Sequence, residues 1–87
     1  MYRHSPDVFF DVVDDEFVAC DSANGAVYTL RGSGAEIFTS CQDADLSAVV
    51  SSLARRYPAE PREMLHAQAE AYLSVLRDAG LIQEVDA

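Results

Sequence analysis

Three short segments in the N-terminal third of the chain have the composition of β-strands. They are Val8–Val13, residues 17–21 and Ala26–Leu30, which are rich in β-branched and aromatic side chains. Asp14-Asp15 separates the first two segments. Asn24-Gly25, where both residues tolerate a positive φ, separates the second from the third. Two consecutive hairpins predict a three-stranded antiparallel meander.

After Gly32 the apolar residues change to the spacing of α-helices. Ser33 and Glu36 have the spacing of a capping box, in which the hydroxyl and the carboxylate satisfy free amides at a helix start. Asp45 is a favourable N-cap for a second helix. The apolar side of the first helix comprises Ala35, Ile37, Phe38 and Cys41, and that of the second comprises Leu46, Val49, Val50, Leu53 and Tyr57.

A third, longer helix is predicted over residues 61–79. Pro61 suits its first turn, where a missing amide is not needed, and Gly80 ends it as a C′ residue. Its buried face comprises Leu65, Ala69, Tyr72, Leu73 and Leu76, and the following Leu81, Ile82 and Val85 are expected to pack back as a short strand or strap. The predicted fold class is α+β: a winged helix-turn-helix-like single domain over residues 1–87, with an N-terminal three-stranded antiparallel β-meander followed by three α-helices.

The hydrophobic content and the net charge of the chain make some classes of function less favourable than others. Hydrophobic residues make up 49% of the chain, enough for a packed core. No apolar run approaches the roughly 20 residues that a membrane span needs, and no signal peptide is visible, so we expect a cytoplasmic protein without a membrane partner. The formal net charge of −9 disfavours nucleic acid as a partner, because non-specific affinity for it comes largely from neutralising phosphates.

The histidines, acids and glycines offer little support for catalysis. His4 lies in an N-terminus that we expect to be frayed, and His66 lies early in the third helix, so both are expected at the surface. Residues 14–16 are three consecutive acids in a turn, where the side chains point apart and do not form a metal site. Residues 32–34, Gly-Ser-Gly, lack the further glycine and the lysine of a phosphate-binding loop.

The two cysteines do not change this conclusion. Cys20 and Cys41 lack any zinc-ligand spacing, and we interpret them as small, buried, reduced side chains. A disulfide, a metal ligand or a reactive thiol are the alternatives. The sequence therefore predicts no catalytic residue, no cofactor and no metal.

The third strand is the best candidate for recognition. Ala26–Leu30 has no charge and no proline, so its edge can pair with the backbone of an added peptide strand. Alternation places Tyr28 and Leu30 toward the core and Val27 and Thr29 on the other face. The alternative is that the domain's own third helix covers this strand.

The order and spacing of these elements resemble the PqqD-like family of peptide-binding domains, also called precursor-peptide recognition elements of ribosomally made natural-product pathways. The resemblance extends from about Val8 to Ile82. One departure is Arg31-Gly32, where many members carry a polar Asn after the strand's Leu. The matching positions are Asn24-Gly25, Val27-Tyr28, Leu30, Gly34-Ala35, Phe38, Leu53, Tyr57, Pro61, Leu73, Leu76 and Gly80-Leu81.

The resemblance implies where a peptide binds. In this family the leader of a precursor peptide adds as an antiparallel strand to the third strand, in a cleft whose other wall is the third helix. Val27, Thr29 and Arg31 would lie along the peptide. The full set of residues expected to bind it is Val27, Tyr28, Thr29, Leu30, Arg31, Gln68, Ala71, Tyr72, Val75 and Asp78.

The function implied is non-catalytic binding of a leader peptide and its presentation to a modifying enzyme or a leader peptidase. The lasso-peptide systems and the radical-SAM enzymes of pyrroloquinoline quinone biosynthesis both use such domains, and the bare domain favours the lasso case. A winged-helix DNA-binding or regulatory protein is the alternative from another class, although the second helix carries only Arg55 and Arg56, at its end. A small enzyme would need a convergent polar pocket, which the sequence does not indicate.

Overall fold

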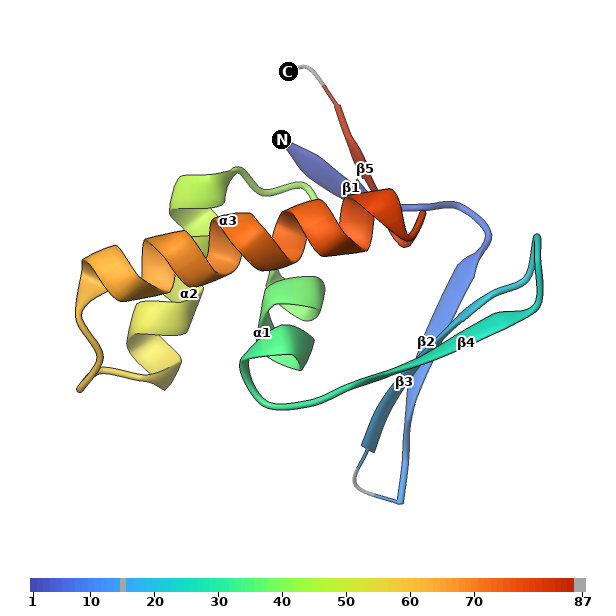
Figure 1. Ribbon diagram of the computed structural model, residues 1–87, viewed down its shortest axis with the longest axis horizontal. Helices are drawn as coiled ribbons and strands as arrows, with labels where there is room; N and C mark the ends of the chain where they lie inside the picture. Colours follow the sequence, from blue (N-terminus) through green and yellow to red (C-terminus); the bar gives the residue numbers. More distant parts are fainter. Residues whose placement is uncertain (15, 86–87) are drawn as a thin grey trace.

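The computed structural model describes residues 1–14 and 16–85. A three-stranded sheet and a group of helices lie side by side, with α1 between the sheet and α2 (Figure 1). The expected α+β class, with a meander ahead of three helices, is confirmed. The elements in chain order are β1 (Tyr2–His4), β2 (Val8–Val13), β3 (Glu16–Asp21), β4 (Ala26–Leu30), α1 (Ser33–Ser40), α2 (Leu46–Arg56), α3 (Arg62–Asp78) and β5 (Ile82–Glu84).

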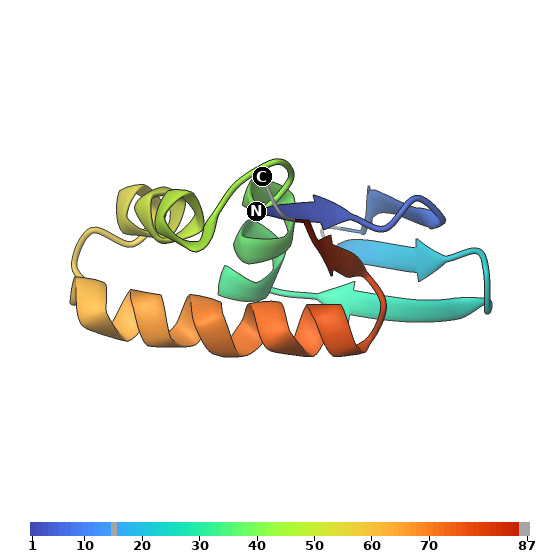
Figure 2. The same cartoon turned by 90° about the horizontal axis from the view of Figure 1, so that it is seen from above.

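The sheet is an antiparallel meander in the order β2-β3-β4. Its second turn uses Asn24 and Gly25 as predicted. Gly25 has a φ of 75° and donates its N–H to the Asp21 carbonyl at 2.8 Å, while the Asn24 side chain accepts from the Ala26 N–H at 2.8 Å. Among the described strands, β4 pairs with β3 alone, so it is an edge strand, and it lies on the α3 side of the sheet (Figure 2).

The prediction of a frayed N-terminus is wrong. β1 pairs antiparallel with β5, with Tyr2 opposite Glu84, so the two ends of the described chain meet (Figure 1). His4, expected at the surface, is half-buried: its ring stacks on Phe38 with centroids 4.2 Å apart, and its Nε2 donates to the Phe38 carbonyl at 2.6 Å. A stacked aromatic contact and pairing with the far end of the chain hold this segment in place.

The predicted capping box at the start of α1 is also wrong. Gly32 is the N-cap, with a φ of 55°, and no side chain of the described residues caps the helix. The Ser33 hydroxyl instead accepts from the Gln68 side-chain amide at 3.2 Å. A contact with α3, which is distant in sequence, replaces the local one that the spacing suggests.

The other helix ends follow the prediction. Asp45 caps α2 with its carboxylate. Gly80 has a φ of 81°, and the N–H groups of Gly80 and Leu81 donate to the carbonyls of Arg77 and Leu76 at 3.0 Å each. This pair of bonds is a Schellman motif, which satisfies carbonyls left free at the end of α3. Within residues 1–14 and 16–85, no helix is long and apolar enough to cross a membrane.

The core lies between the helices and the inner face of the sheet. Along β4, Leu30 is buried and Tyr28 is half-buried, while Val27 and Thr29 are exposed, as alternation predicts. Both cysteines are free; Cys41 is buried, but Cys20 is only half-buried. The buried apolar residues are Val8, Ala19, Leu30, Ile37, Phe38, Cys41, Val49, Val50, Leu53, Leu65, Ala69, Leu73, Leu76, Leu81 and Ile82.

The face of the sheet that is turned away from the core is also apolar. Phe9, Cys20 and Val27 lie opposite one another across the three strands, and Val13 is on the same face. Phe9, Val13 and Val27 are 67%, 52% and 64% exposed. Exposed apolar surface of this kind is typical of sites that contact other proteins.

Candidate functional site

A cleft of about 320 Å³ opens between the end of β4 and the middle of α3. We call it the groove. One wall is the junction of β4 with α1, and the other is the side of α3 that flanks its buried stripe. Most of the lining is apolar. The lining residues are Arg31, Ser33, Gly34, Ile37, Gln68, Ala71, Tyr72 and Val75.

Half of the residues predicted to bind a peptide meet in this groove. Arg31 directly follows β4, and Gln68, Ala71, Tyr72 and Val75 come from α3. They converge because the four α3 positions are spaced by about one helical turn and therefore share a side. Val75 is 58% exposed, so it is open to a ligand and contributes little to the core.

The remaining predicted residues lie outside the groove. Val27 and Thr29 are exposed on β4, beside its open edge, whereas Tyr28 and Leu30 face the core. A strand added to β4 would contact these four residues through their backbone. Asp78 lies in the last turn of α3, where its exposed side chain is 3.8 Å from the Arg77 guanidinium and does not line the groove.

Arg31 is the one positively charged side chain among the described residues that line the groove. Its Nη2 lies 2.6 Å from a carboxylate oxygen of Glu16 on the neighbouring strand. The two side chains are 75% and 44% exposed, so the ion pair stabilises the fold by less than about 1 kcal/mol. Its effect is to hold the guanidinium beside the mouth of the groove.

The floor of the groove depends on a glycine. Gly34 is in the first turn of α1, and a Cβ built there would lie 2.7 Å from both Cζ and the hydroxyl of Tyr72. Only glycine therefore lets the ring lie against the helix backbone. Burial raises the pKa of the Tyr72 hydroxyl above its ordinary value.

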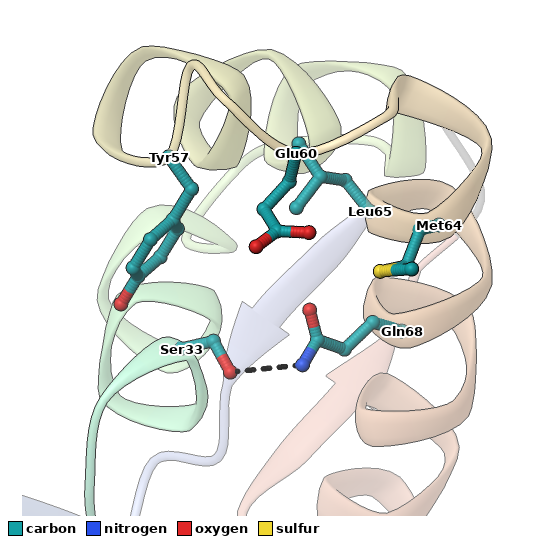
Figure 3. A pocket seen from close by; sticks show the side chains of 6 residues that line it. All are labelled: Ser33, Tyr57, Glu60, Met64, Leu65 and Gln68. Carbon is teal, nitrogen blue, oxygen red and sulfur yellow. Dashed lines mark hydrogen bonds between the residues drawn. The ribbon is translucent and has the colours of Figure 1, made fainter.

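A second chamber of about 260 Å³ continues beyond the groove toward the start of α3. The side chains of Ser33 and Gln68 are joined by a hydrogen bond (Figure 3). Both residues line both cavities, so this bond lies at the boundary between them. The lining residues are Ser33, Tyr57, Glu60, Met64, Leu65 and Gln68. Tyr57 and Glu60 come from the connector between α2 and α3.

Sequence reasoning missed Ser33, Gly34 and Ile37 as groove residues. The spacing of Ser33 indicates a capping box, and that of Ile37 indicates the core. Gly34 carries a usable signal, since glycine within a helix costs about 1 kcal/mol relative to alanine and therefore suggests a packing reason. In the part of the chain that the structure describes, no three His, Cys, Asp or Glu side chains gather as metal ligands.

Two solved structures have this fold. One is described as TbiB1 in complex with the TbiA(beta) leader peptide; it has a TM-score of 0.84 and 19% identity, and the match covers 98% of this chain and 99% of that one. The other is described as lasso peptide synthetase B1 complexed with the leader peptide, with a TM-score of 0.83, 20% identity and coverage of 95% and 98%. At these identities the likeness shows the shared fold.

Comparison by sequence gives the family. Among the curated proteins, none matches the chain. The family model described as Coenzyme PQQ synthesis protein D (PqqD) matches residues 16–82, which include the sheet from β3 onward, all three helices and the first residue of β5. Because this match spans well over half of the sequence, the chain belongs to the PqqD family.

Proposed function

We propose that this protein is a non-catalytic recognition domain that binds the leader region of a ribosomally synthesised precursor peptide. The observation that carries the proposal is the position of the groove, which begins at Arg31, directly after the edge strand β4, and is walled by α3. Membership of the PqqD family supports it, and so do the leader peptides in both similar solved structures.

The peptide would bind as an antiparallel strand on β4. Because β4 runs toward α1, the N-terminal part of the bound segment would lie near Arg31 and its C-terminal part near Ala26. About four to six backbone hydrogen bonds would form, each contributing about 0.5–1.5 kcal/mol. Ordering the peptide offsets much of this gain, so apolar side chains seated in the groove must set the affinity. We expect a Kd between nanomolar and micromolar.

Presentation requires an enzyme partner. A leader peptide bound in the groove leaves the outer face of the sheet, with Phe9 and Val13, free to contact a second protein. The partner would be a modifying enzyme or a leader peptidase. The likeness to the solved structure described as lasso peptide synthetase B1 favours a lasso-peptide system over a radical-SAM enzyme.

Hydrogen exchange tests the proposal. The probe is a synthetic peptide that spans the leader of the precursor encoded beside the gene, with a scrambled peptide as control and the TbiA(beta) leader as a comparison. The leader should give new protection within residues 27–31, because the amides that face the open edge of β4 would enter hydrogen bonds, whereas alternate amides already face β3. Protection confined to α2, or equal protection by the scrambled peptide, would contradict strand addition at β4.

A further inference from the structure

Among the described residues, those that line the second chamber carry negative charge only. Among the described residues that line it, Glu60 alone is charged, and its carboxylate points into the cavity between Tyr57 and Gln68 (Figure 3). The side-chain nitrogen of Gln68 donates to Ser33, which leaves the amide oxygen of Gln68 as an acceptor on the chamber side (Figure 3). A ligand in this space therefore meets a carboxylate and an amide oxygen.

The rest of the lining suits a long aliphatic side chain. Met64 and Leu65 provide an apolar wall, and the ring of Tyr57 stands opposite (Figure 3). The stems of lysine and arginine pack on apolar surface while their charged ends reach a polar partner. An aromatic ring also attracts a cation placed over its face. An acidic side chain would be repelled by Glu60, in a protein with a net charge of −9.

We infer that the second chamber binds a lysine or arginine side chain of the peptide, with Glu60 as its ionic partner. This inference rests on the proposed function, because the groove and the chamber adjoin each other at the Ser33–Gln68 hydrogen bond, where one bound peptide could reach both. The groove would bind an apolar side chain of the peptide, which we call the apolar anchor, and the chamber would bind its basic side chain. Together they select a leader by the order of the two side chains.

The direction of the added strand fixes that order. An antiparallel peptide on β4 has its N-terminal end toward the chamber, so the basic residue precedes the apolar anchor. Met64 in the chamber and Ala71 in the groove are separated by two turns of α3, or about 10 Å along its axis. An extended peptide covers this distance in about three residues.

Glu60 has an alternative, local role. It directly precedes Pro61, the N-cap of α3, where a carboxylate stabilises the positive end of the helix. That role would affect the stability of the fold and leave peptide selection unchanged. Glu63 lies in the first turn of the same helix and does not line the chamber, so it provides a matched control.

The experiment is a calorimetric titration with the leader encoded beside the gene and with variants of that leader at the basic position. Glu60→Gln should weaken binding of the natural leader by about threefold to fivefold at low salt, as for an exposed ion pair, and less at high salt. Glu63→Gln should leave affinity unchanged. A leader with alanine at the basic position should bind Glu60→Gln and the natural protein equally. A leader with glutamate there should bind Glu60→Arg better than the natural protein.

Three results would overturn the inference. The first is a natural leader that has no basic residue upstream of its apolar anchor. The second is an equal loss of leader affinity in Glu60→Gln and Glu63→Gln, and the third is a loss of thermal stability in Glu60→Gln without any change in leader affinity. Failure of the natural protein to bind any leader would instead reject the proposed function. The two failures are therefore distinguishable.

Discussion

Tyr72 of α3 lies so close to the backbone of Gly34 in α1 that a single added carbon would collide with it. A Cβ on Gly34 would be 2.7 Å from two atoms at the end of the Tyr72 side chain. The ring forms part of the groove wall, so the depth of the groove is set by a contact between two helices. Because the end of a tyrosine side chain is mobile, the expected response to a larger residue is rotation of the ring into the groove.

Gly34→Ala should therefore reduce leader binding by at least tenfold while the domain stays folded. Alanine favours the helix by about 1 kcal/mol over glycine, which offsets the cost of moving the ring. Titration with the leader and thermal unfolding measure the two effects, with Thr39→Ala on the exposed side of α1 as control. Adding Tyr72→Leu to Gly34→Ala should restore affinity. An unchanged affinity for Gly34→Ala would show that Tyr72 does not define the binding surface.

Val75 and Leu76 are neighbours in sequence with opposite expected roles. Val75 is 58% exposed in the groove wall, while Leu76 is 2% exposed in the core. Val75→Asp should weaken leader binding at least tenfold, or about 1.4 kcal/mol, because the charge would face an apolar peptide side chain. Leu76→Asp should unfold the domain. Circular dichroism measures whether each variant folds, and titration measures its affinity for the leader. An unfolded Val75→Asp variant, or a folded one that binds the leader as tightly as the natural protein, would refute the groove assignment.

Nucleic acid should not bind. The formal net charge is −9, and the basic residues of α2 are confined to Arg55 and Arg56 in its last turn. A fluorescence anisotropy titration of duplex DNA at low salt should show no binding with micromolar protein, because phosphates would be repelled. Tight binding that weakens as salt is added would contradict the leader-peptide proposal.

The stability of the fold should decrease in alkali through Cys41. Burial raises the pKa of this thiol to about 11, from an ordinary value of 9.0. The folded state holds the proton of the Cys41 thiol more tightly than the unfolded state does. The contribution of the protonated thiol to the stability of the fold is therefore complete below pH 9 and is lost as the pH rises to about 11. We expect the free energy of unfolding to fall by on the order of 2 kcal/mol across this window.

Urea unfolding at both ends of that window measures the effect. Burial also raises the pKa values of Tyr2 and Tyr72, which add to the alkaline loss. The Cys41→Ala variant retains both tyrosines, so the difference between the two proteins isolates the thiol. Identical pH dependence in the variant and the natural protein would show that Cys41 does not contribute.

Local signals in the sequence predict much of the fold. Asn24-Gly25, Asp45 and Gly80 each act on a few neighbouring residues, and each has its predicted backbone role. The buried stripes of α2 and α3 follow from helical spacing for the same reason. The family resemblance predicts the position of the groove. The α3 residues near the groove are predicted because they flank the buried stripe of that helix. Whether these residues bind a peptide stays a prediction.

The features that sequence reasoning missed depend on contacts between distant segments. β1 has three residues, too few for a pattern, and its partner is at the other end of the chain. The Ser33 side chain has the spacing of a cap but bonds to Gln68 in α3. Likewise, the groove role of Gly34 depends on Tyr72 and does not appear in the residues beside it.

The pairing of β1 with β5 has a consequence for the order of folding. It joins Tyr2 to Glu84, so it closes a loop of nearly the whole chain, and the entropy lost in closing a loop grows with its length. The hairpins and the helices form through short-range contacts and should form earlier. The Phe38 ring does not depend on this pairing alone, because Phe10 and Phe17 of the meander also contact it, with centroids 5.4 and 5.9 Å away. The backbone of Tyr2 also bonds to that of Asp43 and Ala44, so β1 has a second attachment in the middle of the chain. During synthesis on a ribosome, the β1–β5 pairing would therefore form only after residues 82–84 have emerged.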